Sequence, residues 1–258
     1  MFSAPARDFM SRSLISVHAD TPLDQVSSIL AIRDISCVIV LDEGGAPCGI
    51  VSSTDILRDA LREMAQGHRD TTPRLSRDVM STSLIGIDEA QSVREAAEAM
   101  VIHRIHRVLV SRGDEPVAVL STRDVMRVIL TQRVALPLSA VMTTSVESVD
   151  VGESVRAALA KLGEKSVRGL VVTDEDFPVG VFTEVEALRA RALPASFLAI
   201  PVEEAMSYGM LCLDDATPLY RVAGYVQATN ARRVLAVKNR KLTGIATGFD
   251  LARAATMD

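Results

Sequence analysis

The sequence contains few aromatic residues, with no tryptophan, three tyrosines and six phenylalanines among 258 residues. Sites that stack sugars or single-stranded nucleic acid on exposed rings need more aromatic side chains, so that class of site is not expected. The net charge of −5 argues against an extended basic surface for nucleic acid.

Cysteine, histidine and long apolar runs are also scarce. Three cysteines form an odd count without metal-site spacing, and four histidines provide few metal ligands. This pattern is typical of a reducing compartment. The longest apolar runs, such as residues 37–41, are far shorter than the roughly 18 residues of a membrane-spanning helix. The first residues lack the pattern of a signal peptide, so we expect a cytoplasmic protein without a metal site or a membrane partner.

Internal repetition is the main feature that the sequence does have. Four segments align on a methionine, with offsets of 70, 62 and 64 residues. Each segment closes on Ser or Thr followed three residues later by an acid, 44 or 45 positions after the methionine. The methionines and acids are Met10 and Asp55, Met80 and Asp124, Met142 and Glu186, and Met206 and Asp250. Agreement in four registers predicts four copies of one structural unit.

Each copy contains helical spacing followed by two short runs with strand character. Aliphatic residues lie 13 and 20 positions after each methionine, and a β-branched run such as residues 38–40 comes next. The copy therefore predicts the order strand, helix, strand, strand, helix in about 60 residues. A unit of that size buries too little surface alone, so we expect the copies to pair.

The order of elements resembles the cystathionine-β-synthase (CBS) domain family. So do the Asp-Val-Met segment at residues 78–80 and the closing pattern of Gly, two apolar residues, Ser or Thr, two further residues and Asp. The resemblance covers nearly the whole chain. It implies an α/β (α+β) fold in which two CBS repeats pair with pseudo-twofold symmetry into a Bateman module. It also implies that two modules form a disc, either within one chain or in a homodimer.

The repeats assign approximate boundaries to these units. Module 1 is expected at residues 1–133, with CBS repeats at about 8–64 and 78–133. Module 2 is expected at residues 134–258, with CBS repeats at about 139–192 and 203–258.

The closing pattern has two interpretations. One is a capping box, in which the hydroxyl and the acid satisfy backbone groups at a helix start. The other is nucleotide binding, because an ionised Asp accepts two ribose hydroxyls and a hydroxyl at a helix N-terminus suits phosphate. The resemblance implies the second role, and both can hold together. Glu186 keeps the cap, but we expect it to weaken or abolish ribose binding in the third copy.

In the CBS family, each cleft joins the closing motif of one repeat to two parts of its partner. These parts lie about five positions after the methionine and about 26 and 27 positions after it. Carried over to this sequence, the expected clefts contain Ser52 and Asp55 with Ile85, His106 and Arg107; Ser121 and Asp124 with Ile15, Ser36 and Cys37; Thr183 and Glu186 with Leu211, Arg232 and Arg233; and Thr247 and Asp250 with Glu147, Val167 and Arg168.

The first cleft ranks highest. Residues 103–108 resemble the His-Arg segment of the γ subunit of AMP-activated protein kinase that meets nucleotide phosphate, and a guanidinium fork suits phosphate. A solvated helix end is the alternative for that pair. The second cleft has no basic group, the third has a Glu in place of Asp, and the fourth contains Glu147, which opposes an anion. We therefore expect one or two occupied clefts. Apolar residues such as Ile15 either sandwich adenine or belong to the core.

These features predict a regulatory sensor that binds AMP, ADP or ATP and signals to an unknown effector protein through conformation or oligomeric state. The sequence has no catalytic triad, phosphate-binding loop or dinucleotide fingerprint, so we expect no enzyme activity, no catalytic residue and no required cofactor. An interaction scaffold with empty clefts, or a protein that binds S-adenosylmethionine, NAD or nucleic acid, remains the alternative.

Overall fold

The computed structural model describes residues 2–11, 14–33, 35–66, 73–165, 167, 169–191 and 193–257. Each repeat contains a three-stranded sheet, in which the first strand runs parallel to the second and the third runs antiparallel to it. One helix connects the first two strands and another follows the third. The predicted fold class and order of elements are confirmed.

The four repeats have closely similar element bounds. Repeat 1 contains β1 (Ser16–His18), α1 (Leu23–Arg33), β2 (Cys37–Leu41), β3 (Pro47–Ser52) and α2 (Ser53–Gln66). Repeat 2 contains α3 (Ser76–Val79), β4 (Gly86–Asp88), α4 (Val93–His103), β5 (Arg107–Arg112), β6 (Glu115–Ser121) and α5 (Thr122–Thr131). Repeat 3 contains β7 (Ser148–Asp150), α6 (Val155–Lys165), β8 (Gly169–Asp174), β9 (Phe177–Thr183) and α7 (Glu184–Arg191). Repeat 4 contains β10 (Leu211–Asp214), α8 (Leu219–Thr229), β11 (Arg233–Lys238), β12 (Lys241–Thr247) and α9 (Gly248–Arg253). Short 3-10 turns are η1 (Ala6–Asp8), η2 (Leu138–Ala140), η3 (Ala195–Ala199), η4 (Val202–Glu204) and η5 (Ala254–Thr256).

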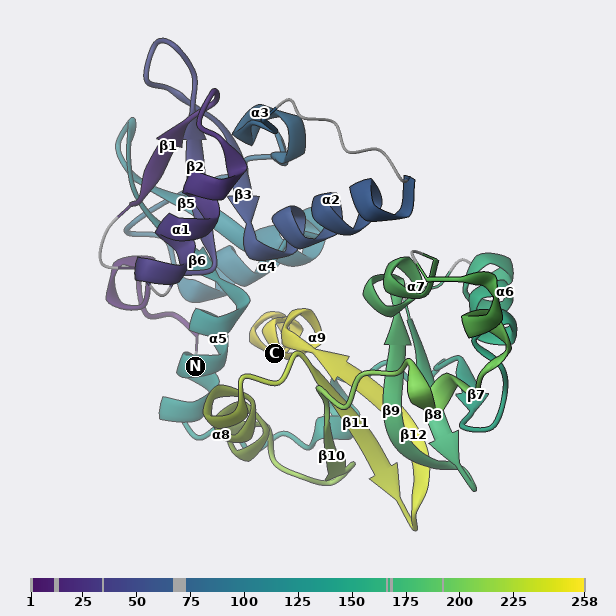
Figure 1. Ribbon diagram of the computed structural model, residues 1–258. Coiled ribbons are helices and arrows are strands. Elements are labelled where there is room, and N and C mark those ends of the chain that lie inside the picture. Colours follow the sequence, from purple (N-terminus) through teal and green to yellow (C-terminus); the bar gives the residue numbers. More distant parts are fainter. Residues whose placement is uncertain are drawn as a thin grey trace.

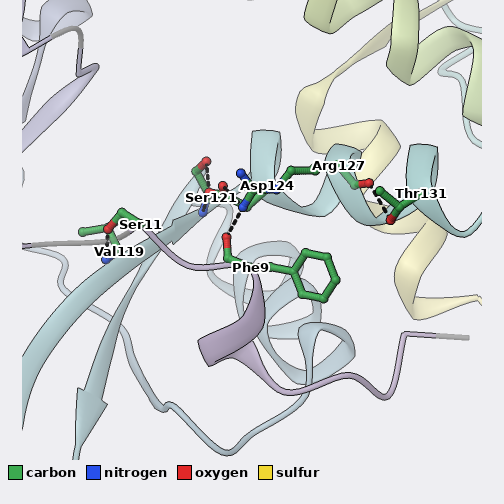
Figure 2. Close-up of polar contacts among 7 residues, drawn as sticks. All are labelled: Phe9, Ser11, Val119, Ser121, Asp124, Arg127 and Thr131. Atoms are coloured by element: carbon green, nitrogen blue, oxygen red, sulfur yellow. Dashed lines mark hydrogen bonds and ion pairs between the residues drawn. The ribbon is translucent and has the colours of Figure 1, made fainter.

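The residues before each first strand, here called the leading segments, lie on the partner repeat. Their backbone bonds to the partner include Ala6 N to Gln91 O (2.7 Å), Ser76 N to Thr21 O (2.9 Å), Leu138 N to Thr217 O (2.9 Å) and Val202 N to Glu153 O (2.7 Å). Figure 2 shows the first exchange, with Phe9 and Ser11 beside Val119 and Arg127 of repeat 2. Because the exchange is reciprocal, repeats 1 and 2 form one pair and repeats 3 and 4 form the other.

The aligned methionines explain a glycine in the closing pattern. A Cβ added at Gly49 would lie 2.5 Å from Met80 Sδ, and one at Gly244 would lie 2.6 Å from Met142 Sδ. Neither glycine has a positive φ, so close approach of the partner's methionine is what favours glycine here. Repeat 2 has the fully buried Ala118 at the equivalent position.

The two pairs of repeats contact each other unequally. Repeats 2 and 4 share one hydrophobic core, to which α5 contributes Val128 and Ile129 and repeat 4 contributes Val222 and Leu251. In Figure 1 the teal α5 lies beside α8 and the yellow α9, in agreement with their close packing. Repeats 1 and 3 keep separate cores and meet through α2 and α7. Among the described residues, no helix has the length and apolar character needed to cross a membrane.

Candidate functional site

The acid of the closing motif reaches back to the Ser or Thr in all four repeats, and repeats 2 and 4 form the complete capping box. One carboxylate oxygen accepts both the backbone N–H and the hydroxyl of the Ser or Thr three residues earlier. The hydroxyl distances are 2.5 Å for Ser52–Asp55, 2.6 Å for Ser121–Asp124, 2.5 Å for Thr183–Glu186 and 2.8 Å for Thr247–Asp250. The capping interpretation is therefore confirmed for repeats 2 and 4, and Glu186 accepts the same two hydrogen bonds as the three aspartates.

The second carboxylate oxygen distinguishes the repeats. Asp124 Oδ1 accepts from Arg127 Nη2 at 3.1 Å, as Figure 2 shows, and Asp250 Oδ1 accepts from Thr143 Oγ1 at 3.4 Å. Asp55 Oδ1 lies 3.9 Å from Arg58 Nη1, which is an ion pair beyond hydrogen-bond length. The outer oxygen of Asp55 is thus held more loosely than those of the other two aspartates.

The pairing between the second and third strands shows which residue of each repeat lies opposite the Ser or Thr of the closing motif. Arg107 pairs with Ser121 and Arg233 with Thr247, whereas Cys37 pairs with Ser52. In repeat 3 it is Gly169 that pairs with Thr183. The corresponding pair in repeat 3 is therefore residues 168 and 169. The sequence-based assignment of Val167 and Arg168 starts one residue before this pair, and a spacing of 26 and 27 positions from Met142 also gives residues 168 and 169. Arg168 itself lies outside the described residues.

Arg107 lies at the centre of module 1, where the two repeats meet. Its Nη2 donates to Ser36 Oγ at 3.1 Å, so the side chain crosses from repeat 2 to repeat 1. Its Nε is buried and has no hydrogen-bond partner among the described residues. A buried donor without a partner is costly in a folded protein, which makes this atom a candidate ligand contact.

The charges around Arg107 affect the pKa of the Cys37 thiol. Burial raises the pKa of the Cys37 thiol, Arg107 opposes that rise, and the carboxylates of Asp124 and Asp55 add to it. Acids from both closing motifs therefore lie close enough to Cys37 to affect its ionisation. The structure brings together the central residues of the first and second expected clefts at one place.

The remaining candidates of module 1 lie around this centre. The exposed ring of His106 lies edge-on to Phe249 of repeat 4, with 5.9 Å between ring centroids. His106 therefore contacts the second module, a contact that the sequence analysis missed because Phe249 belongs to another repeat. Ile15 and Ile85 are half-buried, and their carbonyls accept from Ile39 (3.0 Å) and Leu109 (2.8 Å). They also pack against the cores of their repeats.

Module 2 has a different balance of charge at its centre. Burial lowers the pKa of Arg233, and the nearby Glu186 carboxylate opposes that shift, so these two residues of the third expected cleft lie close together. Arg232 is exposed, and Leu211 packs against the shared core.

The fourth expected cleft is assembled only in part. Glu147 lies 3.9 Å from Lys165, which offsets its charge, and its carbonyl accepts from Val171 at 3.0 Å. Thr143, which the sequence analysis missed, is the residue of repeat 3 that reaches Asp250. Val167 lies elsewhere, in a cavity between α2, α6 and α7.

The three cysteines are free, half-buried thiols, and the described residues contain no cluster of three or more potential metal ligands among His, Cys, Asp and Glu. Because burial raises the pKa of Cys37 and Cys212, little of either thiol is thiolate at neutral pH.

We expect the alkylation rates of Cys37 and Cys212 to be low at pH 7 and still to be rising at pH 9. Iodoacetamide labelling followed by peptide mass spectrometry measures each rate, with urea-unfolded protein as the control. A plateau for Cys37 below pH 8.5 would contradict the raised pKa.

Comparisons with known proteins support the fold that these residues form. The sequence profile described as "CBS domain" matches residues 6–65, 76–131 and 138–193. The structure resembles MJ1225 of Methanocaldococcus jannaschii, a proposed archaeal homolog of g-AMPK, at 16% identity and a TM-score of 0.73 over 97% of this chain and 99% of that one. It also resembles an uncharacterized conserved protein of Pyrococcus horikoshii at 18% identity and a TM-score of 0.68, over 98% of this chain and 100% of that one.

A relative by sequence is uncharacterized protein MJ1404 of Methanocaldococcus jannaschii, which is 21% identical over 271 residues. The match covers 98% of this chain and 62% of that protein, so the chain spans less than two thirds of the relative's length. Repeat 4 lies outside the profile matches, but it has the same order of strands and helices as the other three. The profile covers more than half of the residues, and the chain belongs to the CBS domain family.

Proposed function

We propose that the protein is a sensor that binds an adenine nucleotide, AMP, ADP or ATP, in module 1, with Arg107 contacting the phosphate. The observation that carries this proposal is the buried Nε of Arg107, which has no partner among the described residues. A guanidinium is always charged and presents donors in a planar fork, which suits phosphate better than a neutral or cationic ligand.

The ribose and the helix start complete the proposed site. Asp55 uses one oxygen to accept both hydrogen bonds from Ser52, and among the described residues its other oxygen has only the 3.9 Å ion pair to Arg58. That oxygen is available to accept a ribose hydroxyl. The N-terminus of α2 begins at Ser53, beside Ser52, and the positive end of its helix dipole favours an anion. We take the binding unit to be residues 1–133, with repeats at about 8–64 and 78–133, and the second module to be residues 134–258.

A signal from this site would pass to the second module. His106 precedes Arg107 directly and contacts Phe249 of repeat 4, so movement of Arg107 on binding would reach α9. Coupling free energies between sites are commonly about 1–3 kcal/mol, which is enough to change the affinity for an effector protein several-fold.

The alternative is an interaction scaffold with empty clefts. The closing motifs of repeats 2 and 4 favour it, since both oxygens of Asp124 and of Asp250 already accept hydrogen bonds within the protein. S-adenosylmethionine and NAD are the other adenosine ligands to be tested against the nucleotides.

Thermal unfolding with AMP, ADP, ATP, S-adenosylmethionine and NAD tests this proposal. A ligand at 100 times its Kd stabilises the folded state by about 2.7 kcal/mol, so the adenine nucleotides should raise Tm in a saturable way. The absence of a shift at millimolar nucleotide would support the scaffold instead. A larger shift with S-adenosylmethionine than with any phosphorylated ligand would rule out the role proposed for Arg107.

A further inference from the structure

A cavity of about 500 Å³ lies between the two modules on the side of repeats 1 and 3. It is bordered by α2 of module 1 and by α6 and α7 of module 2. Repeats 1 and 3 do not share a core, unlike repeats 2 and 4, so apolar packing does not close this side of the molecule. Figure 1 shows α2 and α7 at this side, above and to the right of the α5–α9 contact.

The cavity has a predominantly positive border. Arg58 and Arg62 come from α2 and Arg191 comes from α7, so both modules contribute a cation. Glu184 is the acid among the lining residues, and it pairs with Arg58 at 3.5 Å. Arg62 and Arg191 are exposed, and their charges remain to attract an anion once Arg58 and Glu184 offset each other.

The inner wall of the same cavity is apolar. Leu159 and Leu162 of α6 line it together with Val167 and with Leu188 of α7. Leu162 is buried, and the other three are half-buried, so they offer apolar surface that a ligand could cover. A fully polar anion would leave this wall unused, whereas a fully apolar ligand would leave the arginines without a partner.

We propose that this cavity binds a small amphipathic anion, with a carboxylate or phosphate head at Arg62 and Arg191 and an apolar body against the leucines. One molecule bound there would contact both modules at once. Because repeats 2 and 4 already share a core, a bridge between repeats 1 and 3 would hold the two modules in one relative placement. None of the four closing-motif acids lines this cavity, so the site is distinct from the cleft proposed for the nucleotide, although Arg58 lies between the two and pairs with Asp55 at 3.9 Å.

Gly163 provides a matched pair of variants for the test. It lines the cavity on α6, and a Cβ added there would meet nothing within 4 Å. Gly163→Leu fills the cavity, whereas Gly163→Ala leaves most of its volume free, and both improve the helix propensity of the position. The double variant Arg62→Ala/Arg191→Ala tests the role of the positive charge. Arg189→Ala is the control, because Arg189 is an exposed arginine of α7 that is not among the lining residues.

The probe is 1-anilinonaphthalene-8-sulfonate, which has a sulfonate on an apolar ring system and fluoresces in apolar surroundings. Titration of the full chain should give saturable fluorescence that Gly163→Leu abolishes and Gly163→Ala retains. Removal of both arginines should weaken binding about tenfold or more, as expected for charged hydrogen bonds, while Arg189→Ala should change it little.

Competition then identifies the head group. Displacement by decanoate indicates a carboxylate ligand, and stronger displacement by decyl phosphate indicates a phosphate. Equal fluorescence in Gly163→Leu and in the parent would overturn the proposal, because the probe would then bind outside the cavity. Displacement by AMP but by neither decyl compound would also overturn it. A failure of AMP to shift Tm would not affect this result, so the two proposals fail independently.

Discussion

Replacement of Arg107 by alanine lowers the affinity for AMP by about 10- to 100-fold, the range expected when hydrogen bonds to a charged group are lost. Arg107 crosses from repeat 2 to Ser36 of repeat 1, and its buried Nε is the donor that the proposed phosphate would satisfy. Isothermal titration calorimetry with AMP measures the loss. Unfolding curves of the same variant show whether the fold is retained.

Two further variants separate the geometry of Arg107 from its charge and from a general effect of arginine loss. Arg107→Lys keeps the charge without the planar fork, so we expect an intermediate affinity. Arg112→Ala removes an arginine from the other end of β5, where it pairs with Glu89 at 2.7 and 3.0 Å, and should leave AMP binding unchanged. An Arg107→Ala protein that binds AMP as tightly as the parent would place the phosphate elsewhere.

Replacement of Gly244 by alanine destabilises the protein by about 1–3 kcal/mol, the usual cost of an extra methyl group in a packed interior. The new Cβ would lie 2.9 Å from the carbonyl oxygen of Thr143 and 2.6 Å from Met142 Sδ. The Thr143 backbone is itself paired with Ile245 through bonds of 2.8 and 2.9 Å. The leading segment of repeat 3 therefore cannot retreat without breaking its pairing to β12.

Gly49→Ala is the matched control for this effect. All three nearest atoms to a Cβ at Gly49 belong to the side chain of Met80, which can change rotamer. We expect a smaller loss of stability than in Gly244→Ala. Urea unfolding with a shared m-value measures both losses, and equal values for the two variants would show that the backbone contact at Thr143 is unimportant.

The glycine and methionine pattern shows how much of the fold could be predicted from the sequence. The repeat revealed both residues at fixed spacing, and the expected strand and helix order followed from local periodicity. The sequence did not show that Met80, Met142 and Met206 each fill the space over a glycine of the partner repeat. The contact between Met142 and Gly244 joins residues about a hundred positions apart, and four similar repeats offer several possible partners for each methionine.

The sequence partly indicated that repeats 2 and 4 pack together more closely than repeats 1 and 3. Asp59 of α2 stands four residues after Asp55, the place that Val128 of α5 takes after Asp124. Val128 is fully buried in the core shared with repeat 4, whereas Asp59 pairs with Arg74 at 2.7 Å. An apolar residue at this position of α5 and a charged residue at the same position of α2 thus distinguish the side where repeats 2 and 4 share a core from the side where repeats 1 and 3 border a cavity.

The sequence by itself determined the four repeats, the order of strands and helices, and the capping boxes, because these depend on residues that are close along the chain. The tertiary structure alone decided that Arg107 crosses to Ser36, and that repeats 2 and 4 share a core while repeats 1 and 3 enclose a cavity. The physical reason is that repeats of one pattern present nearly equivalent faces. Packing between distant side chains, which local periodicity does not contain, selects which of those faces meet.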